Sequence, residues 1–261
     1  MSAEKLNITI IQPDIVWENK EANLANYEKC ISEIKDKREV VILPEMFSTG
    51  FSMNPELLAE TMEDPSVQWM KDIAAKYRCI LAGSLIIEEN GNYFNRLIWM
   101  QPNGTYGVYD KRHLFAYAGE DEHYTAGEKR LIASVKGWKI CLLVCYDLRF
   151  PVWSRNQPEG AYDLLVYVAN WPERRSLAWK ALLKARAIEN QCYCVGVNRV
   201  GDDGNNIHYS GGSSVFGPLG ETIWQNENEI ITHTVSLDKD ILVKTRESLP
   251  FLKDGDKFLL L

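Results

Sequence analysis

The sequence lacks the long apolar segments of a membrane protein and the positive charge of a nucleic-acid-binding protein. Apolar runs such as residues 164–169 are far too short to cross a bilayer. Residues 1–6 show no apolar stretch behind a basic start, so no secretory signal is visible. The net charge is −7, which argues against nucleic acid or an anionic membrane as the main partner. We therefore expect a cytoplasmic protein that acts on small molecules.

The six cysteines do not have the spacing of a zinc site. Cys141 and Cys145 are followed by Cys192 and Cys194, without the paired spacing or nearby histidines that a tetrahedral site needs. In the cytoplasm we expect these thiols to be reduced. The glycines between residues 211 and 220 do not match nucleotide- or dinucleotide-binding loops either. The sequence therefore indicates neither a bound metal nor an organic cofactor.

No linker rich in proline or serine and no internal repeat divides the 261 residues, so we predict one α/β domain over residues 1–261. Hydrophobic periodicity and turn signals predict its elements. We expect strands over residues 6–11, 39–43, 79–87, 93–100, 105–109, 131–135, 138–144, 163–169, 192–200, 213–216, 221–224 and 230–235. We expect helices over residues 18–38, 65–77, 174–191 and 238–246. The apolar face expected for the third helix comprises Leu177, Ala181, Leu182, Ala185 and Ile188.

Two segments are predicted to have special roles. Residues 112–127 lack regular periodicity, and a long irregular segment inside a compact domain is usually functional. The tail, residues 238–261, ends in four apolar residues, which predicts packing on a partner subunit.

Asp64 before Pro65 is expected to cap the second helix.

Three predicted strands end in residues that could carry chemistry: Glu45, Lys111 and Cys145. In open α/β sheets, ligands bind beyond the carboxyl ends of the strands. A cysteine there becomes a nucleophile if a base or a cation favours its thiolate. Glu45 could take the proton, and Lys111 could stabilise a developing oxyanion.

Each of these residues also has an ordinary structural interpretation. Cys145 could be a small core residue, since free cysteines are among the most buried residue types. Glu45 could be a solvated turn residue after Pro44, and Lys111 could form a surface basic pair with Arg112. Spacing alone does not decide between these alternatives.

Three segments resemble the motifs of the nitrilase (carbon-nitrogen hydrolase) superfamily, and the resemblance extends from the first strand to about residue 224. They are residues 41–45 (VILPE), 109–115 (YDKRHLF) and 143–151 (LVCYDLRFP). They occur in the family's order with comparable gaps. The resemblance implies a four-layer α-β-β-α sandwich that usually forms dimers, with a Glu45–Lys111–Cys145 triad.

A fourth carboxylate belongs to the site of this family. Glu120, which precedes residues 123–127, takes that role best, although Glu122 is close enough to confuse the assignment. The resemblance implies acyl transfer through a thioester without a metal or cofactor. In this mechanism Glu45 is the base and Cys145 the nucleophile, and Lys111 with the backbone N–H of Tyr146 holds the oxyanion.

Within the superfamily, the sequence is most similar to bacterial omega-amidases. The similarity includes residues 110–115, residues 145–155 and residues 169–172 (ANWP). That branch releases ammonia from the terminal amide of dicarboxylic monoamides such as 2-oxoglutaramate and 2-oxosuccinamate. The alternatives are an N-carbamoyl amidase, another aliphatic amidase or, from another class, a non-catalytic binding protein on the same fold.

A substrate with a distant carboxylate predicts a cation in the pocket, most simply an arginine. The candidates are Arg149, Arg174, Arg175 and Arg199. We favour Arg175, because it opens the predicted helix after Trp171 and Pro172. For Arg149 we expect instead a structural ion pair with Asp147. Phe115, Tyr146 and Trp171 are predicted to wall the pocket, although core packing is an alternative for each.

Overall fold

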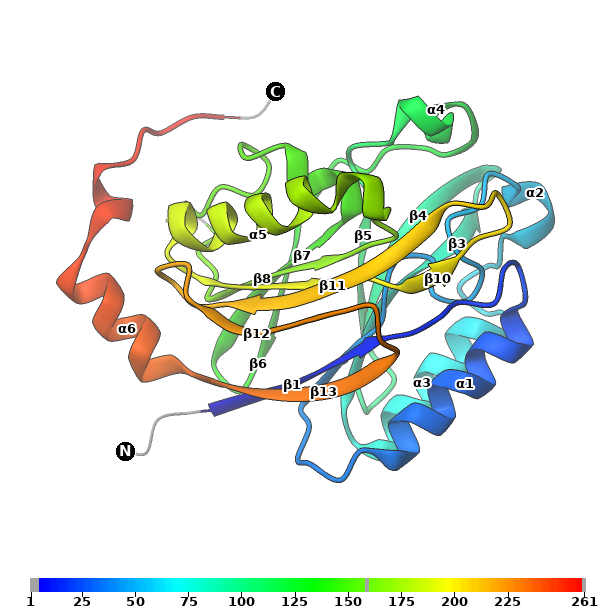
Figure 1. The fold of residues 1–261 in the computed structure, drawn as a ribbon, viewed down its shortest axis with the longest axis horizontal. Coiled ribbons are helices and arrows are strands. Elements are labelled where there is room, and N and C mark those ends of the chain that lie inside the picture. Colours follow the sequence, from blue (N-terminus) through cyan, green and yellow to red (C-terminus); the bar gives the residue numbers. More distant parts are fainter. Residues whose placement is uncertain (1–4, 158–159, 260–261) are drawn as a thin grey trace.

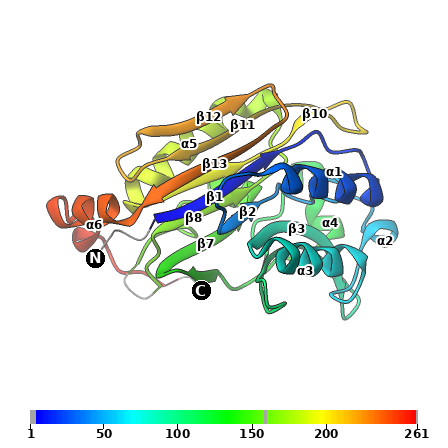
Figure 2. The ribbon, with the colours of Figure 1, turned by 90° about the horizontal axis from the view of Figure 1, so that it is seen from below.

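A computed structural model of the chain describes residues 5–157 and 160–259. Two β-sheets face each other in the middle of the molecule, and helices cover their outer faces (Figure 1). Helices α1 and α3 lie on the outer face of one sheet, and α5 lies on the outer face of the other (Figures 1 and 2). The predicted four-layer α-β-β-α sandwich is therefore confirmed.

Within the described residues, six strands form the first sheet, in the order β13-β1-β2-β3-β4-β5. They are β1 (Lys5–Gln12), β2 (Val40–Ile42), β3 (Ile80–Glu89), β4 (Asn92–Met100), β5 (Tyr106–Asp110) and β13 (Ile231–Asp238). Strands β1, β2 and β3 are parallel. Asn90 and Gly91, both at positive φ, form the predicted hairpin turn between β3 and β4.

The second sheet has the order β10-β11-β9-β8-β7-β6, with β12 paired to β11. Its strands are β6 (Leu131–Val135), β7 (Trp138–Val144), β8 (Leu164–Val168), β9 (Tyr193–Val197), β10 (Val200–Asp202), β11 (His208–Phe216) and β12 (Thr222–Glu227). Strands β7, β8 and β9 are parallel. Every residue of β8 is buried, as expected for a central parallel strand that is covered on both faces.

The main hydrophobic core lies between the two sheets. It joins Ile8, Ile42 and Trp99 of the first sheet to Leu142 and Val166 of the second. Because buried apolar area is the main favourable term in folding, this core fixes the two sheets against each other. The carboxyl ends of β2 and β7 are therefore held at one edge of the sandwich.

The helices differ from the predictions mainly at their ends. They are α1 (Lys20–Glu33), α2 (Pro55–Leu58), α3 (Pro65–Tyr77), α4 (Glu120–His123), α5 (Ser176–Asn190) and α6 (Lys239–Ser248). Helix α3 begins at Pro65 as predicted, but Asp64 does not cap it. The Asp64 carboxylate instead accepts a hydrogen bond from the backbone N–H of Thr61 at 2.6 Å. The short helices α2 and α4 were not among the predicted elements.

The apolar face predicted for α5 is not the face that packs on the sheet, although Leu182 of that set is partly buried against the core. Leu177 is 82% exposed and Ile188 is 49% exposed, whereas Trp179, Leu183 and Ala187 pack on the sheet. Both sets recur at helical spacing, so the sequence pattern allowed either one. Trp179 also donates a hydrogen bond to the backbone carbonyl of Gly212 at 2.8 Å, which holds the helix in the observed rotation.

One strand end and two segments outside the regular elements can also be compared with the predictions. The strand predicted over residues 192–200 ends at Val197, because the side chain of Asn198 donates to the carbonyl oxygens of Trp171 and Gly211. Residues 112–127 form only a 3₁₀ turn, η1 (Ala116–Ala118), and the short α4. At the tail, Leu259 is 90% exposed, and Leu260 and Leu261 lie outside the described residues.

Candidate active site

Three charged side chains from separate elements meet at the edge of the sandwich. The ammonium of Lys111 lies 2.9 Å from Glu45 Oε1 and 2.8 Å from Glu120 Oε2, and none of the three side chains is exposed. Glu45 follows β2, Lys111 follows β5, and Glu120 opens α4. The structure thus brings together three of the residues that the sequence singled out.

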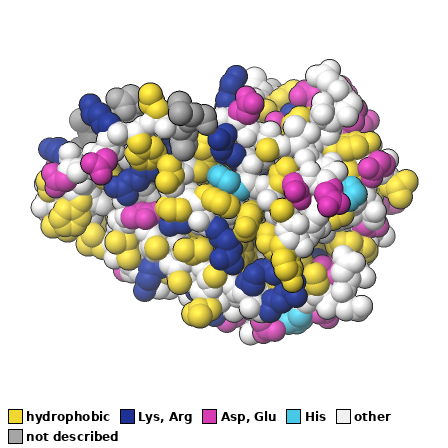
Figure 3. Space-filling model, turned by 90° about the horizontal axis from the view of Figure 1, so that it is seen from above, with side chains coloured by type: hydrophobic (Ala, Val, Ile, Leu, Met, Phe, Trp, Pro, Cys, Tyr) yellow, Lys and Arg dark blue, Asp and Glu magenta, His cyan; other side chains and the backbone are white. Residues whose placement is uncertain are grey.

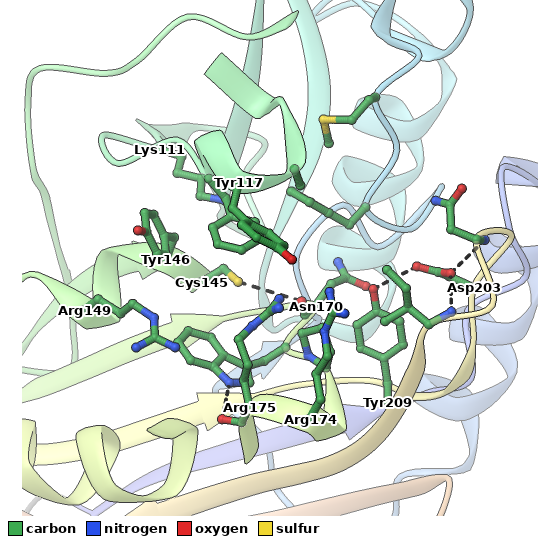
Figure 4. Close-up of a pocket in the computed structure, with 18 residues that line it drawn as sticks. Lys111, Tyr117, Cys145, Tyr146, Arg149, Asn170, Arg174, Arg175, Asp203 and Tyr209 are labelled. Atoms are coloured by element: carbon green, nitrogen blue, oxygen red, sulfur yellow. Dashed lines mark hydrogen bonds between the residues drawn. The ribbon is translucent and has the colours of Figure 1, made fainter. Parts of the chain in front are cut away.

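Cys145 lies beside this cluster at a sharp turn. It follows β7 directly and opens the 3₁₀ turn η2 (Cys145–Arg149) with φ at 43°. A non-glycine residue in this left-handed region is strained and persists only when its surroundings hold it. The turn presents the thiol to a cavity that Lys111 also lines, and the thiol contacts the carbonyl oxygen of Asn170 at 3.9 Å (Figure 4).

The charges around Cys145 oppose one another. Burial and the nearby carboxylate of Glu45 raise the pKa of the Cys145 thiol well above its usual value, while Lys111 acts to lower it. Burial alone would lower the pKa of Lys111, but the carboxylates of Glu120 and Glu45 raise it beyond its usual range. These effects favour a protonated Cys145 thiol and a charged Lys111 in the resting site.

Glu45 is held by donors on both carboxylate oxygens. Oε1 accepts from the side-chain amide of Asn95 at 2.8 Å as well as from Lys111, and Oε2 accepts from the backbone N–H of Asn170 at 2.8 Å. The side-chain amide of Asn170 also donates to the backbone carbonyl of Glu45 at 2.6 Å. These contacts fix the carboxylate next to the thiol.

Glu120, and not Glu122, belongs to the cluster. Glu120 is fully buried and accepts hydrogen bonds from Lys111 and from the backbone N–H of Phe115 at 2.6 Å, whereas Glu122 is exposed. Burial raises the pKa of Glu120; Lys111 counteracts this shift and Glu45 adds to it. By position, therefore, the fourth carboxylate of the cluster is Glu120 and not Glu122.

A cavity of about 270 Å³ opens in front of Cys145. Phe115, Tyr146 and Trp171, which the sequence suggested as walls, all line it. On the side away from Lys111, the side chains of Arg149, Arg174 and Arg175 extend toward it (Figure 4). The face of the molecule seen from above also shows lysine and arginine side chains gathered among hydrophobic ones near its middle (Figure 3).

Two of the candidate arginines, Arg175 and Arg199, have different surroundings. The guanidinium of Arg175 lies over the ring of Phe115 at 4.9 Å, and burial together with Arg174 lowers its pKa. Arg199 is buried, and its Nη2 lies 3.0 Å from a carboxylate oxygen of Asp14. It does not line the cavity but lies behind Tyr209, with its guanidinium 4.8 Å from the centre of that ring.

The prediction of an ion pair between Arg149 and Asp147 is wrong. Arg149 lines the cavity with its guanidinium 4.9 Å from the ring centre of Trp171. Asp147 instead accepts hydrogen bonds from Tyr109 and His113. The turn of η2 points these two side chains in different directions, which their close spacing in sequence did not reveal.

Sequence reasoning missed two asparagines at the centre of the site. Asn95 donates to both Glu45 and Glu120, and Asn170 joins Glu45 to Cys145. A signal for Asn95 was present, because a polar residue in the middle of a strand such as β4 must find a partner when it is buried. Asn170 follows β8 and so lies at the same sheet edge as Cys145.

The sequence profile described as "Carbon-nitrogen hydrolase" matches residues 7–244 of the chain. The omega-amidase YafV of Escherichia coli is 46% identical over 257 residues, covering 98% of each chain. The 2-oxoglutaramate amidase of Bacillus subtilis is 31% identical over 258 residues, covering 98% of this chain and 99% of that protein.

A solved structure of similar fold comes from Xanthomonas campestris. It is described as a CN-hydrolase superfamily protein with an arsenic adduct in the active site, and it is 40% identical with a TM-score of 0.95. The match covers 98% of this chain and 99% of that one. The chain is therefore similar to these relatives, in sequence and in fold, over almost its whole length.

Proposed function

The chain belongs to the carbon-nitrogen hydrolase family, and we propose that it releases ammonia from the terminal amide of small dicarboxylic monoamides such as 2-oxoglutaramate or 2-oxosuccinamate. One observation carries this proposal. Cys145 faces a cavity that has the buried Glu45–Lys111–Glu120 cluster on one side and three arginines on the other. The first group suits amide hydrolysis, and the second suits an anionic substrate.

The reaction begins with a proton transfer from the Cys145 thiol to Glu45. The thiolate sulfur then attacks the amide carbonyl carbon, and the carbonyl π electrons move to oxygen to give a tetrahedral oxyanion. Lys111 and the backbone N–H of Tyr146 stabilise that charge. Preorganised donors of this kind contribute roughly 3 kcal/mol each to lowering a barrier.

The oxyanion collapses as the carbon–nitrogen bond breaks. Glu45 returns its proton to the leaving nitrogen, which departs as ammonia and leaves a thioester on Cys145. Glu45 next takes a proton from water as that water attacks the thioester. Collapse of the second oxyanion breaks the carbon–sulfur bond and returns the proton to the thiolate. Glu120 orients substrate or water through its position beside Lys111.

The arginines supply the selectivity for an anion. A carboxylate at the far end of the substrate would meet Arg175, which we favour as the main contact, with Arg149 and Arg174 nearby. Close positive charges repel one another, which is one cause of the lowered pKa of Arg175. A bound carboxylate relieves that repulsion. The omega-amidase and 2-oxoglutaramate amidase names of the relatives support this class of substrate.

The experiment that tests this function is ammonia release by the purified protein from three amides. We expect rapid release from 2-oxoglutaramate, slower release from glutaramate, which lacks the 2-oxo group, and little from an N-carbamoyl amine. Cys145→Ala should abolish release from all three. Faster turnover of the carbamoyl amine would favour an N-carbamoyl amidase, and no turnover of any amide would favour a binding protein.

We also propose that the protein forms a homodimer in the cytoplasm. The outward face of α5 carries the exposed Leu177 and Ile188, and the tail carries Phe251 in η4 (Phe251–Asp254), which is 58% exposed. Exposed apolar side chains of this kind favour burial against a second copy of the chain. The six free thiols suit a reducing compartment. Light scattering should give a molar mass of twice that of the chain. In Leu177→Glu the measured mass should fall to that of a single chain.

Among the described residues, no helix is long and apolar enough to span a membrane.

A further inference from the structure

The buried carboxylate of Asp147 lies two residues after Cys145 and accepts four hydrogen bonds. Oδ2 accepts from the backbone N–H of Val144 at 3.0 Å and from the hydroxyl of Tyr109 at 2.7 Å. Oδ1 lies 3.1 Å from the backbone nitrogen of His113 and 2.7 Å from its Nδ1. Asp147 has no solvent-exposed surface.

These donors come from both sides of the site. Val144 immediately precedes Cys145, whereas Tyr109 and His113 stand two residues before and two residues after Lys111. One carboxylate thus joins the end of β7 to the end of β5. The two segments belong to different sheets, so this contact acts in addition to the packing of the core.

The donors to Asp147 are themselves fixed. The hydroxyl of Tyr109 accepts from the indole N–H of Trp153 at 2.9 Å. The ring of His113 stacks on Phe150, with 3.8 Å between ring centres and 5° between the planes. These contacts restrict the two donor side chains, so Asp147 can couple the position of one segment to that of the other.

We propose that Asp147 is a positioning residue that sets Lys111 relative to the Cys145 thiol. The inference rests on the proposed function, since the distance between these two groups matters only if Lys111 stabilises charge next to the sulfur. Two observations support it. The backbone of Cys145 is at a strained positive φ, which its surroundings must hold. A buried carboxylate is costly unless donors surround it, so four donors indicate a built site.

The chain offers a matched control at the opposite end of the same strand. Asp163 accepts a hydrogen bond from the backbone N–H of Lys139 at 3.0 Å, near the start of β7. It also pairs with Lys239 and Arg246. Asp163 therefore anchors β7 much as Asp147 does, but far from the cavity.

The experiment compares Asp147→Asn with Asp163→Asn. The side-chain amide of asparagine accepts hydrogen bonds only at its oxygen, because its nitrogen is a donor. Asp147→Asn therefore loses the bonds that one of the two carboxylate oxygens accepts. We expect kcat for 2-oxoglutaramate to fall roughly 10- to 100-fold with KM within about twofold. Iodoacetamide alkylation of Cys145, followed by peptide mass spectrometry, should require a higher pH, because a displaced Lys111 stabilises the thiolate less.

Asp163→Asn should lower the melting temperature without changing kcat or the pH profile of alkylation. Tyr109→Phe removes one of the four bonds to Asp147, together with the bonds that the Tyr109 hydroxyl accepts from Trp153 and from the backbone N–H of Arg112. It serves if Asp147→Asn does not fold, and it should show the same shift at smaller size. A wild-type kcat together with an unchanged alkylation profile, in Asp147→Asn or in Tyr109→Phe, would overturn the proposal. Absence of amide turnover by the wild type would defeat the proposed function instead, while the alkylation profiles would still test the role of Asp147.

Discussion

Glu45 Oε1 accepts a hydrogen bond from Lys111 Nζ at 2.9 Å, and neither side chain exposes any surface. A buried ion pair of this kind contributes little net stability, because desolvation offsets much of the attraction. Its presence at the end of two strands is better explained by chemistry than by folding. In the proposed mechanism, the Glu45 carboxylate exchanges a proton with Cys145 while the Lys111 ammonium remains charged.

Glu45→Gln tests the role of the base. The variant retains the size of the side chain but cannot take a proton, so kcat should fall roughly 100- to 10,000-fold. Lys111 keeps its contact with Glu120, so we expect the protein to remain folded by circular dichroism. Activity within tenfold of wild type would show that another group removes the thiol proton.

Glu120→Gln and Glu122→Gln form a matched pair, because the two acids are separated by one residue but only Glu120 contacts Lys111. For Glu120→Gln we expect kcat to fall roughly 100-fold. Glu122→Gln should leave kcat unchanged, because this side chain is solvated. Steady-state ammonia release at saturating substrate measures both. Equal effects would contradict the assignment of the fourth carboxylate to Glu120.

Arg175→Ala should raise KM for 2-oxoglutaramate roughly tenfold or more, since it removes a charged partner of the substrate carboxylate. The control is a neutral aliphatic amide such as butanamide, for which the same variant should change KM by less than about twofold. Arg149→Ala shows whether the guanidinium over Trp171 shares this role. An unchanged KM for the anionic substrate in Arg175→Ala would refute the proposed contact.

The buried thiols predict a loss of stability in alkali. Burial raises the pKa of Cys141 to about 12 and raises that of Cys192 well above its usual value. In the unfolded chain these thiols ionise near pH 8.5. The folded state therefore holds more protons above that pH, and the free energy of unfolding should fall as pH rises.

Urea unfolding between pH 8 and pH 9.5 measures this decline. Each such thiol contributes up to about 1.4 kcal/mol per pH unit once the unfolded form is ionised. Cys192→Ala should give a shallower decline than wild type, even though the cavity it leaves lowers stability at pH 7. A free energy of unfolding that stays constant or rises over this range would contradict the prediction.

Much of the fold could be predicted, because strands such as β8 and β7 are apolar runs bounded by turn residues. The rotation of α5 could not, since Leu177 and Trp179 belong to two apolar stripes of the same helix. Only the packing against β11, where Trp179 bonds to Gly212, decides between them.

The residues that meet at the site could be predicted where their type is chemically reactive. Glu45, Lys111 and Cys145 stand at strand ends, and the motif resemblance linked them. Asn95 and Arg149 were missed or misassigned for a physical reason. The partners of a side chain depend on its direction in three dimensions, and neither a strand position nor a spacing of two residues specifies that direction.

The most direct test of the account is peptide mass spectrometry of the protein after rapid acid quenching during turnover of 2-oxoglutaramate. The account predicts a mass increase equal to the substrate minus ammonia on the peptide that contains Cys145, and on that residue rather than on Cys141. It predicts the loss of both the adduct and ammonia release in Cys145→Ala. An acyl group on another residue, or continued ammonia release by Cys145→Ala, would contradict the central claim that Cys145 is the nucleophile.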